Sequence, residues 1–243
     1  MSNWYSAAWG GRCCRRLLAG GLFVLALNQA AVGENLRDPY ENFNRTMYSV
    51  NSAVDKIAIK PVAKAYDATV PLPVKAGISN FFGNTGDLWI GANSAFQGKF
   101  SDAGIDIARL LVNSTVGIFG LFDVASELGL EKHEEDLGQT LAVWGVPDGA
   151  YFFWPFIGPR TLRDTFGWIG DSYADPVWSA RTRSISVRNS LVATRFVDIR
   201  ASLLPADKVI DEGALDKYAY LRDAYLQRRR NQIFDGRPPR DIE

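Results

Sequence analysis

Apolar residues recur every three or four positions over much of the chain after residue 34, and alternating apolar and polar patterns are nearly absent there. Two series take steps of four, three and four positions, which place side chains on one helix face: Val192, Phe196, Ile199 and Leu203, and Ala214, Tyr218, Leu221 and Tyr225. Asp211 and Glu212 precede the second series, and acidic residues suit a helix start. Ser101 or Asp102 can cap a third helix over residues 105–112. Because prolines are scattered between these segments, the pattern predicts an all-α domain of short amphipathic helices.

Residues 105–125 differ from this amphipathic pattern, because apolar side chains occupy nearly every side of the predicted helix. The only full charges in the stretch are Asp106, Arg109 and Asp123. A polar triplet at residues 113–115 and glycines at 117 and 120 interrupt it, which predicts a central helical hairpin. Two interpretations remain open: the hairpin is buried in a protein core, or it dips into one leaflet of a membrane.

A second apolar segment, rich in aromatic residues, covers residues 78–96. Aromatic side chains suit a membrane interface as well as a core, so this segment is compatible with both interpretations. The two segments together supply ten candidates for lipid or membrane contact: Phe81, Phe82, Trp89, Leu110, Leu111, Val116, Ile118, Phe119, Leu121 and Phe122.

The first 33 residues have the composition of an export signal. Arg12, Arg15 and Arg16 precede an apolar run over residues 17–27, and small residues follow as far as Gly33. This run is well short of the roughly 20 residues that a membrane-spanning helix needs. We therefore expect a signal peptide over residues 1–33 with cleavage near Gly33, the alternative being an uncleaved membrane anchor.

The charge balance changes when this signal is set aside. The whole chain has 27 Lys and Arg against 27 Asp and Glu, which leaves no broad basic surface and excludes nucleic acid as a partner. Without residues 1–33 the chain has 24 basic and 27 acidic side chains, and it loses Cys13 and Cys14, its only cysteines. Both cysteines precede the apolar run, whereas a lipoprotein carries its acylated cysteine directly after such a run. We expect an exported protein that is not lipidated, with a helical domain over residues 34–235 and a flexible tail over residues 236–243.

Two short motifs resemble chemical sites. His133 begins an acidic run, but it is the only histidine, and a metal site in one short segment usually needs a second histidine or a cysteine. A solvated loop or a helix start is therefore the favoured interpretation. Ser172 lies in a Gly-Asp-Ser block like that of some secreted esterases, but the histidine lies upstream of it and no nucleophile elbow is present. We expect no metal, no cofactor and no enzymatic activity.

Six sequence blocks, in order along the chain, resemble the MlaA family, which is also called VacJ. They are residues 38–45 (DPYENFNR), 78–84 (ISNFFGN), 109–125 (RLLVNSTVGIFGLFDVA), 135–141 (EDLGQTL), 158–164 (GPRTLRD) and 222–229 (RDAYLQRR). The resemblance implies a single ring-shaped α-helical domain at the periplasmic face of a Gram-negative outer membrane. It also implies a partnership with a trimeric outer-membrane porin and with a soluble periplasmic lipid carrier.

The function implied by this resemblance is phospholipid transport without catalysis. Family members remove mislocalised phospholipid from the outer leaflet and pass it to the periplasmic carrier, which maintains the lipid asymmetry of the outer membrane. Asn42, Phe43 and Asn44 lie where the chain enters the predicted ring, and we expect them to latch it. The alternatives are a structural adaptor that packs against porins and a secreted lipid hydrolase that uses Ser172.

Overall fold

Helices make up most of the computed structural model, which describes residues 38–179 and 184–239. In chain order the elements are α2 (Glu41–Val54), the π-helical turn η1 (Asp55–Ile59), α3 (Lys60–Thr69), α4 (Leu72–Phe96), α5 (Phe100–Thr115), α6 (Val124–Glu127), α7 (Leu137–Val143), β1 (Tyr151–Trp154), β2 (Gly158–Thr161), α8 (Leu162–Ala174), α9 (Pro176–Ser179), α10 (Ile185–Ser202), α11 (Leu204–Gly213) and α12 (Lys217–Ile233). The signal peptide predicted for residues 1–33 lies outside the described residues. Residues 236–239 follow α12 as exposed chain, and the flexibility predicted for the tail remains a prediction.

The starts of several helices are set by side-chain caps. Asp136 caps α7, Thr161 caps α8 and Asp216 caps α12, each accepting a hydrogen bond from a backbone N–H of the first turn. The cap predicted at Ser101 or Asp102 is wrong, because α5 begins at Phe100 and has no side-chain cap.

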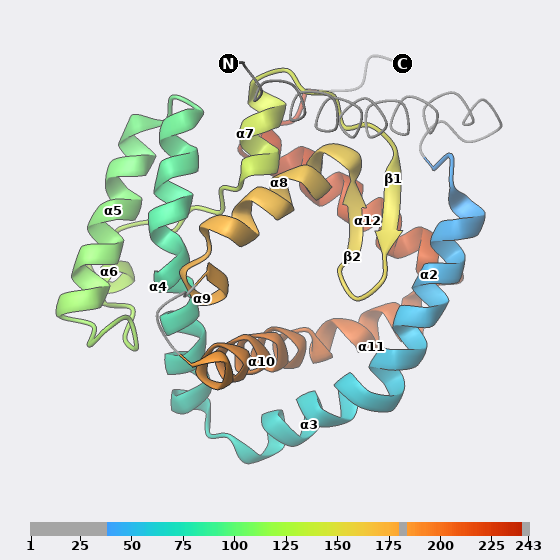
Figure 1. Cartoon of the computed structure of the whole chain (residues 1–243), viewed down its shortest axis with the longest axis horizontal. Coiled ribbons are helices and arrows are strands. Elements are labelled where there is room, and N and C mark those ends of the chain that lie inside the picture. The colour runs from blue at the N-terminus through green and yellow to red at the C-terminus, as the bar shows by residue number, and fades with distance from the viewer. Residues whose placement is uncertain (1–37, 180–183, 240–243) are drawn as a thin grey trace, which may run out of the picture.

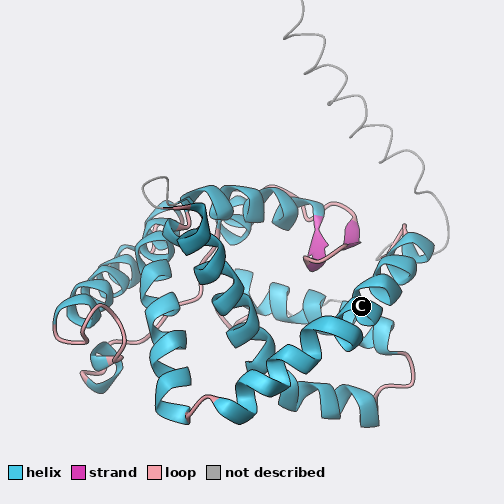
Figure 2. Cartoon of the chain, turned by 60° about the horizontal axis from the view of Figure 1, so that its bottom comes forward, coloured by secondary structure: helices cyan, strands magenta, loops and turns pink. Residues whose placement is uncertain are grey.

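The elements follow one another around a ring, which agrees with the predicted ring-shaped domain (Figure 1). The pair α4 and α5 lies on one side, α3 and α10 on the next, and α2 opposite the pair (Figure 1). The strands, α7 and α8 complete the circuit, and Figure 2 shows the same arrangement from a tilted view. The all-α class is therefore confirmed. The helices are not all short, since α4 has 25 residues.

The helical hairpin of the molecule has different limits from the predicted ones. α5 continues to Thr115 and packs side by side with α4, whereas the chain after Thr115 forms a turn and the single-turn helix α6. The expectation that residues 105–125 supply both arms is wrong, because α4 supplies the second arm. The polar triplet ends the helix, as the pattern indicates, and it does so at the end of α5 far from the connection between α4 and α5.

A two-stranded antiparallel sheet was not expected from the sequence. β1 pairs with β2 in a register that sets Tyr151 opposite Thr161 and Phe152 opposite Arg160. Tyr151 and Phe153, on one face of β1, pack with Tyr218 of α12 in the hydrophobic core. The sheet therefore joins the C-terminal helix to the rest of the ring.

Candidate functional site

The outer face of α5 is apolar and open. Phe100, Ile107 and Leu111 recur at helical spacing on this face, and all three are exposed. The apolar surface continues past the helix end through five exposed side chains of the following turn: Val116, Ile118, Phe119, Leu121 and Phe122. Phe119 is 77% exposed. We call these eight residues the hairpin surface.

The seam between α4 and α5 is polar, in contrast to this surface. Asp106, Arg109 and Asn113 recur at helical spacing on the inner face of α5, and all three are buried. Facing residues of α4 are also polar: Ser94 Oγ donates to Asp106 Oδ2 at 3.1 Å, and the buried Asn84 donates to Ser114 Oγ at 3.0 Å. A helix pair in water ordinarily buries its apolar side chains and exposes its polar ones. This pair is inside out, which is the arrangement expected of helices surrounded by lipid, where polar side chains hold the helices together.

The turn that follows α5 has an unusual backbone. Ile118 and Phe119 have φ of 53° and 56°, the left-handed region that β-branched and bulky residues rarely adopt. Gly120 follows at 83°. The backbone N–H groups of Phe119, Gly120 and Phe122 nevertheless all donate to carbonyl oxygens within residues 113–117. A turn that bonds most of its own backbone N–H groups is suited to contact with hydrocarbon, where no water is present to bond them.

A buried charge pair holds this turn against the helices. Arg109, 1% exposed, donates from Nη2 to both carboxylate oxygens of Asp123 at 2.9 and 3.0 Å. Asn113 donates to the same carboxylate at 2.9 Å. Burial alone would raise the pKa of Asp123, but hydrogen bonds from Ser126, Asn113 and Arg109 lower it to about 2. The carboxylate therefore stays ionised and the pair remains neutral beneath the hairpin surface.

The ten residues predicted to contact lipid divide by exposure. Six are exposed and belong to the hairpin surface: Leu111, Val116, Ile118, Phe119, Leu121 and Phe122. Phe81, Trp89 and Leu110 are half-buried, and Phe82 is only 6% exposed. Trp89 donates from its indole to Asp171 Oδ1 at 2.7 Å, which ties it to α8. Contact with lipid remains a prediction for the set, and the exposed six are the residues whose geometry allows it without rearrangement.

None of the described helices combines the length and the apolarity needed to cross a bilayer. The hairpin surface belongs to a segment that could enter one leaflet, as in the second interpretation of the sequence.

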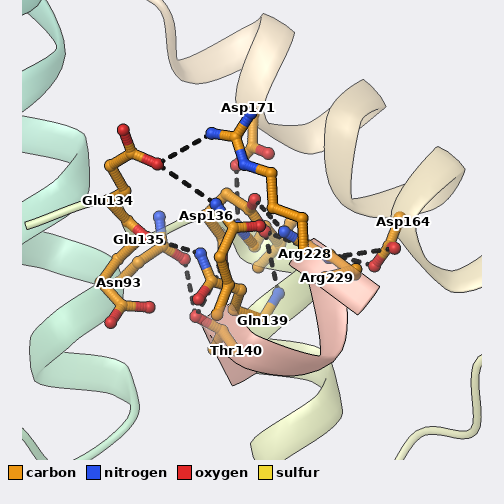
Figure 3. Close-up of polar contacts among 12 residues, drawn as sticks. Asn93, Glu134, Glu135, Asp136, Gln139, Thr140, Asp164, Asp171, Arg228 and Arg229 are labelled. Carbon is orange, nitrogen blue, oxygen red and sulfur yellow. Dashed lines mark hydrogen bonds and ion pairs between the residues drawn. The ribbon is translucent and has the colours of Figure 1, made fainter. Parts of the chain in front are cut away.

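A charge network buried among α7, α8 and α12 was missed by the sequence analysis (Figure 3). Arg229 of α12 donates two hydrogen bonds to Asp136, both of 2.6 Å, and contacts Asp164 of α8 at 3.0 Å. Tyr225 also donates to Asp164, at 2.5 Å. Burial would raise the pKa of Asp164, but the charge of Arg229 and the Tyr225 bond outweigh it and lower the pKa. The network joins three helices that are distant in sequence.

The close approach of α7 and α8 depends on two glycines. A Cβ at Gly138 would lie 2.4 Å from Nη2 of Arg229, and one at Gly167 would lie 2.4 Å from the backbone N of Gly138. Both positions therefore need glycine for the network to close.

The predicted latch residues have unequal positions. Asn42 and Phe43 are exposed, whereas Asn44 is fully buried. The Asn44 side chain donates to Tyr151 O at 3.1 Å and accepts from Phe153 N at 2.8 Å, so it bonds both a carbonyl and an N–H of β1. It also donates to Asp38 Oδ1 at 2.8 Å. Asn44 thus joins the first helix of the ring to the sheet, and a latching role remains a prediction.

His133 and Ser172 make structural contacts. His133 Nδ1 lies 2.8 Å from Asp106 Oδ1, and Ser172 donates to Trp168 O, one turn earlier in its own helix. The acidic run that starts at His133 leads into α7, with Asp136 as the N-cap. The interpretation of this run as a helix start is confirmed.

Cavities adjoin the sheet and α12 at two places. One of about 760 Å³ lies between α12 and the segment before and within the sheet, with Tyr151, Leu226 and Phe234 among its lining residues. The other, of about 250 Å³, lies where α2, α10, α11 and α12 meet, and charged side chains such as Lys60, Arg200 and Asp207 line it. Neither adjoins the hairpin surface.

Comparisons with known proteins agree with the sequence blocks. A family model described as MlaA lipoprotein matches residues 36–232. The intermembrane phospholipid transport system lipoprotein MlaA of Escherichia coli strain K12 is 36% identical over 195 residues, which are 79% of this chain and 76% of the relative. An uncharacterized protein of Rickettsia bellii is 32% identical over 197 residues, 81% of this chain and 76% of the relative.

A solved structure from work on the structural basis for maintenance of bacterial outer membrane lipid asymmetry is similar in fold. The TM-score is 0.69 at 32% sequence identity, and the match covers 82% of this chain and 99% of the solved one.

Proposed function

The chain belongs to the MlaA family, and from this premise we propose that it is a component of phospholipid transport that maintains outer-membrane lipid asymmetry. Its role is to remove mislocalised phospholipid from the outer leaflet and pass it on toward the periplasm. The named relatives from Escherichia coli and Haemophilus influenzae belong to an intermembrane phospholipid transport system, which supports the substrate class.

The inside-out polarity of the α4 and α5 pair is the observation that carries this proposal. Its apolar hairpin surface suits acyl chains, and in its polar seam Ser94 donates to Asp106 and Arg109 donates to Asp123. The two acyl chains of a phospholipid have about 30 methylenes in all. Their transfer from the membrane into water would cost on the order of 20 kcal/mol of free energy, at about 0.8 kcal/mol per methylene. A protein that contacts the bilayer lowers this barrier by keeping the chains against apolar surface, and no covalent chemistry is needed.

The finer parts of the proposal concern location, partners and chemistry. We place the chain at the periplasmic face of the outer membrane, exported by a signal peptide cleaved near Gly33 and not lipidated. A trimeric porin and a soluble periplasmic carrier are its proposed partners, as the family resemblance implies. The structural contacts of His133 and Ser172 support a role without catalysis.

Deletion of the gene tests the proposed function. We expect more phospholipid in the outer leaflet and greater sensitivity to detergent, both reversed by the wild-type gene on a plasmid. A Ser172→Ala gene should restore asymmetry as well as the wild type does, because Ser172 bonds only its own helix among described residues. An unchanged outer leaflet in the deletion strain would contradict the proposal, and failure of Ser172→Ala would favour a hydrolase.

A further inference from the structure

Arg160 of β2 is a half-buried arginine that has no anionic partner in the part of the chain that the structure describes. Its Nε is buried and makes no hydrogen bond, and its guanidinium forms no ion pair with any residue in the described part of the chain. Arg109, Arg163 and Arg229, which are buried more deeply, each contact at least one carboxylate. Arg160 therefore differs from these three arginines in having no carboxylate partner among the described residues.

The surroundings of Arg160 are aromatic. Its guanidinium lies over the Trp168 ring of α8, 5.3 Å from the ring centre. Phe152, opposite Arg160 in the sheet register, packs with Tyr40 at 4.9 Å and with Trp154 at 5.2 Å between ring centres. The guanidinium thus lies beside rings that offer apolar surface and no negative charge.

The carboxylate groups nearby are already neutralised. Asp164, whose charge reaches Arg160, accepts from Tyr225 and contacts Arg229. Burial lowers the pKa of Arg160, which shows that the removal of its charge from water is not fully offset by its neighbours. A cation partly removed from water without a paired anion is unfavourable, and an anion that arrived from outside would offset this cost.

We propose that Arg160 receives the phosphodiester group of a phospholipid during transport, while Trp168 and Phe152 flank the adjoining apolar part of the lipid. This inference rests on the proposed function. A guanidinium presents parallel N–H groups that match two phosphate oxygens, and one phosphodiester charge balances one arginine. The sheet that carries Arg160 lies at the inner side of the ring of helices (Figure 1).

Calorimetric titration of the purified full chain in detergent tests the assignment. The ligands are dihexanoyl-phosphatidylglycerol, glycerol 3-phosphate and uncharged dihexanoylglycerol. We expect the phospholipid to bind the wild type, Arg160→Gln to weaken this binding at least tenfold, and Arg160→Lys to lie between them. The control is Arg188→Gln, because Arg188 bonds only the neighbouring Asn189 among described residues, and it should bind as the wild type does.

Thermal unfolding without lipid separates a ligand-binding arginine from a structural one. Since Arg160 has no anionic partner among the described residues, Arg160→Gln should leave the Tm unchanged or raise it. A fall in Tm with unchanged phospholipid affinity would make Arg160 a structural residue and overturn the inference. Equal affinity for glycerol 3-phosphate and for the phospholipid would indicate a free-anion site and would also overturn it.

The outcomes also separate this inference from the proposed function. Full restoration of asymmetry by Arg160→Gln in the deletion strain, with undiminished binding, rejects the role of Arg160 and leaves the transport function standing. An unchanged outer leaflet in the deletion strain itself rejects the transport function.

Discussion

Buried charges at single positions hold this fold together, and Arg229 is the clearest case. It lies in a run of three arginines. Such a run is typical of the C-terminal end of a helix, where the helix dipole favours positive charge. Four positions earlier lies Tyr225, the last member of the apolar series of α12, so Arg229 extends the same helix face into the interior. One further step of four positions in the apolar series of α12 leads to Arg229, and this spacing is the signal that could have identified it as an inward-facing residue. Its partners Asp136 and Asp164 carry no such signal, because they lie far away in the sequence.

Adjacent arginines give a matched test of this network. Arg229→Met should destabilise the protein by about 3 kcal/mol, because the buried Asp164 would keep only Arg163 among the described cations and the partly exposed Asp136 would lose its cation. Arg228 pairs with Glu134 at the surface, so Arg228→Met should cost less than about 1 kcal/mol. Urea unfolding measures both. Similar losses for the two variants would show that the buried network is not a major source of stability.

The pKa of Asp123 predicts a dependence of stability on pH. Its folded value of about 2 lies below the value of about 3.9 expected in an unfolded chain. The carboxylate therefore stabilises the fold above pH about 4, and this contribution disappears as the pH falls from about 4 toward 2. We expect Asp123→Asn to lower the free energy of unfolding at pH 7 and the difference from wild type to shrink through this window. A difference that is the same at every pH would contradict the assignment.

At the scale of elements, apolar periodicity identified several helices. It did not identify the polar seam between α4 and α5 or the two short strands. The series from Val192 to Leu203 and from Ala214 to Tyr225 fall largely on α10 and α12. α5 was placed as well, but its partner was not, because residues 105–125 are apolar on so many sides that local pattern cannot choose a neighbour. The strands have four residues each, too short for an alternating pattern to emerge.

The candidate site could be predicted from the sequence only in part. The apolar excess of residues 116–122 is visible in the sequence, and all five of its large apolar side chains are exposed. The burial of Phe82 was not predictable, because burial depends on which elements pack together, and the local sequence pattern does not determine this. The left-handed backbone at Ile118 and Phe119 contradicts local preference, and contacts elsewhere in the turn impose it.

Glycine in the turn after α5 provides a test at this scale. Gly120→Ala adds both left-handed strain and a Cβ at 2.6 Å from the Asn84 side chain. Gly129→Ala adds comparable strain at φ +77°, but no atom lies within 4 Å of its Cβ. We expect a loss of about 1 kcal/mol for Gly129→Ala and about 2–3 kcal/mol for Gly120→Ala. Thermal unfolding measures both, and equal losses would show that the turn after α5 is not tightly packed against α4.

The ring as a whole depends on joints between segments far apart in the chain. Asn44 is such a joint, because its buried amide bonds both the carbonyl of Tyr151 and the N–H of Phe153 in β1. Asn44→Ala should destabilise the protein by about 2–4 kcal/mol, since two buried backbone groups lose their partners. Asn42→Ala, in the same helix but exposed, should change stability by less than about 0.5 kcal/mol. Urea unfolding that fails to separate these two variants would remove the structural basis for a latch at Asn44.

The position of the hairpin surface in lipid is the central structural claim and has a direct measurement. An environment-sensitive NBD dye would be attached at Phe119→Cys, or at Leu215→Cys as the control, after Cys13 and Cys14 are replaced by serine. Both native side chains are exposed, but Leu215 lies in the connection between α11 and α12, away from the hairpin. On addition of phospholipid vesicles, we predict a blue-shifted, brighter emission and quenching by lipids labelled in the acyl chain for the dye at position 119 only. No response at position 119, or an equal response at position 215, would contradict the account.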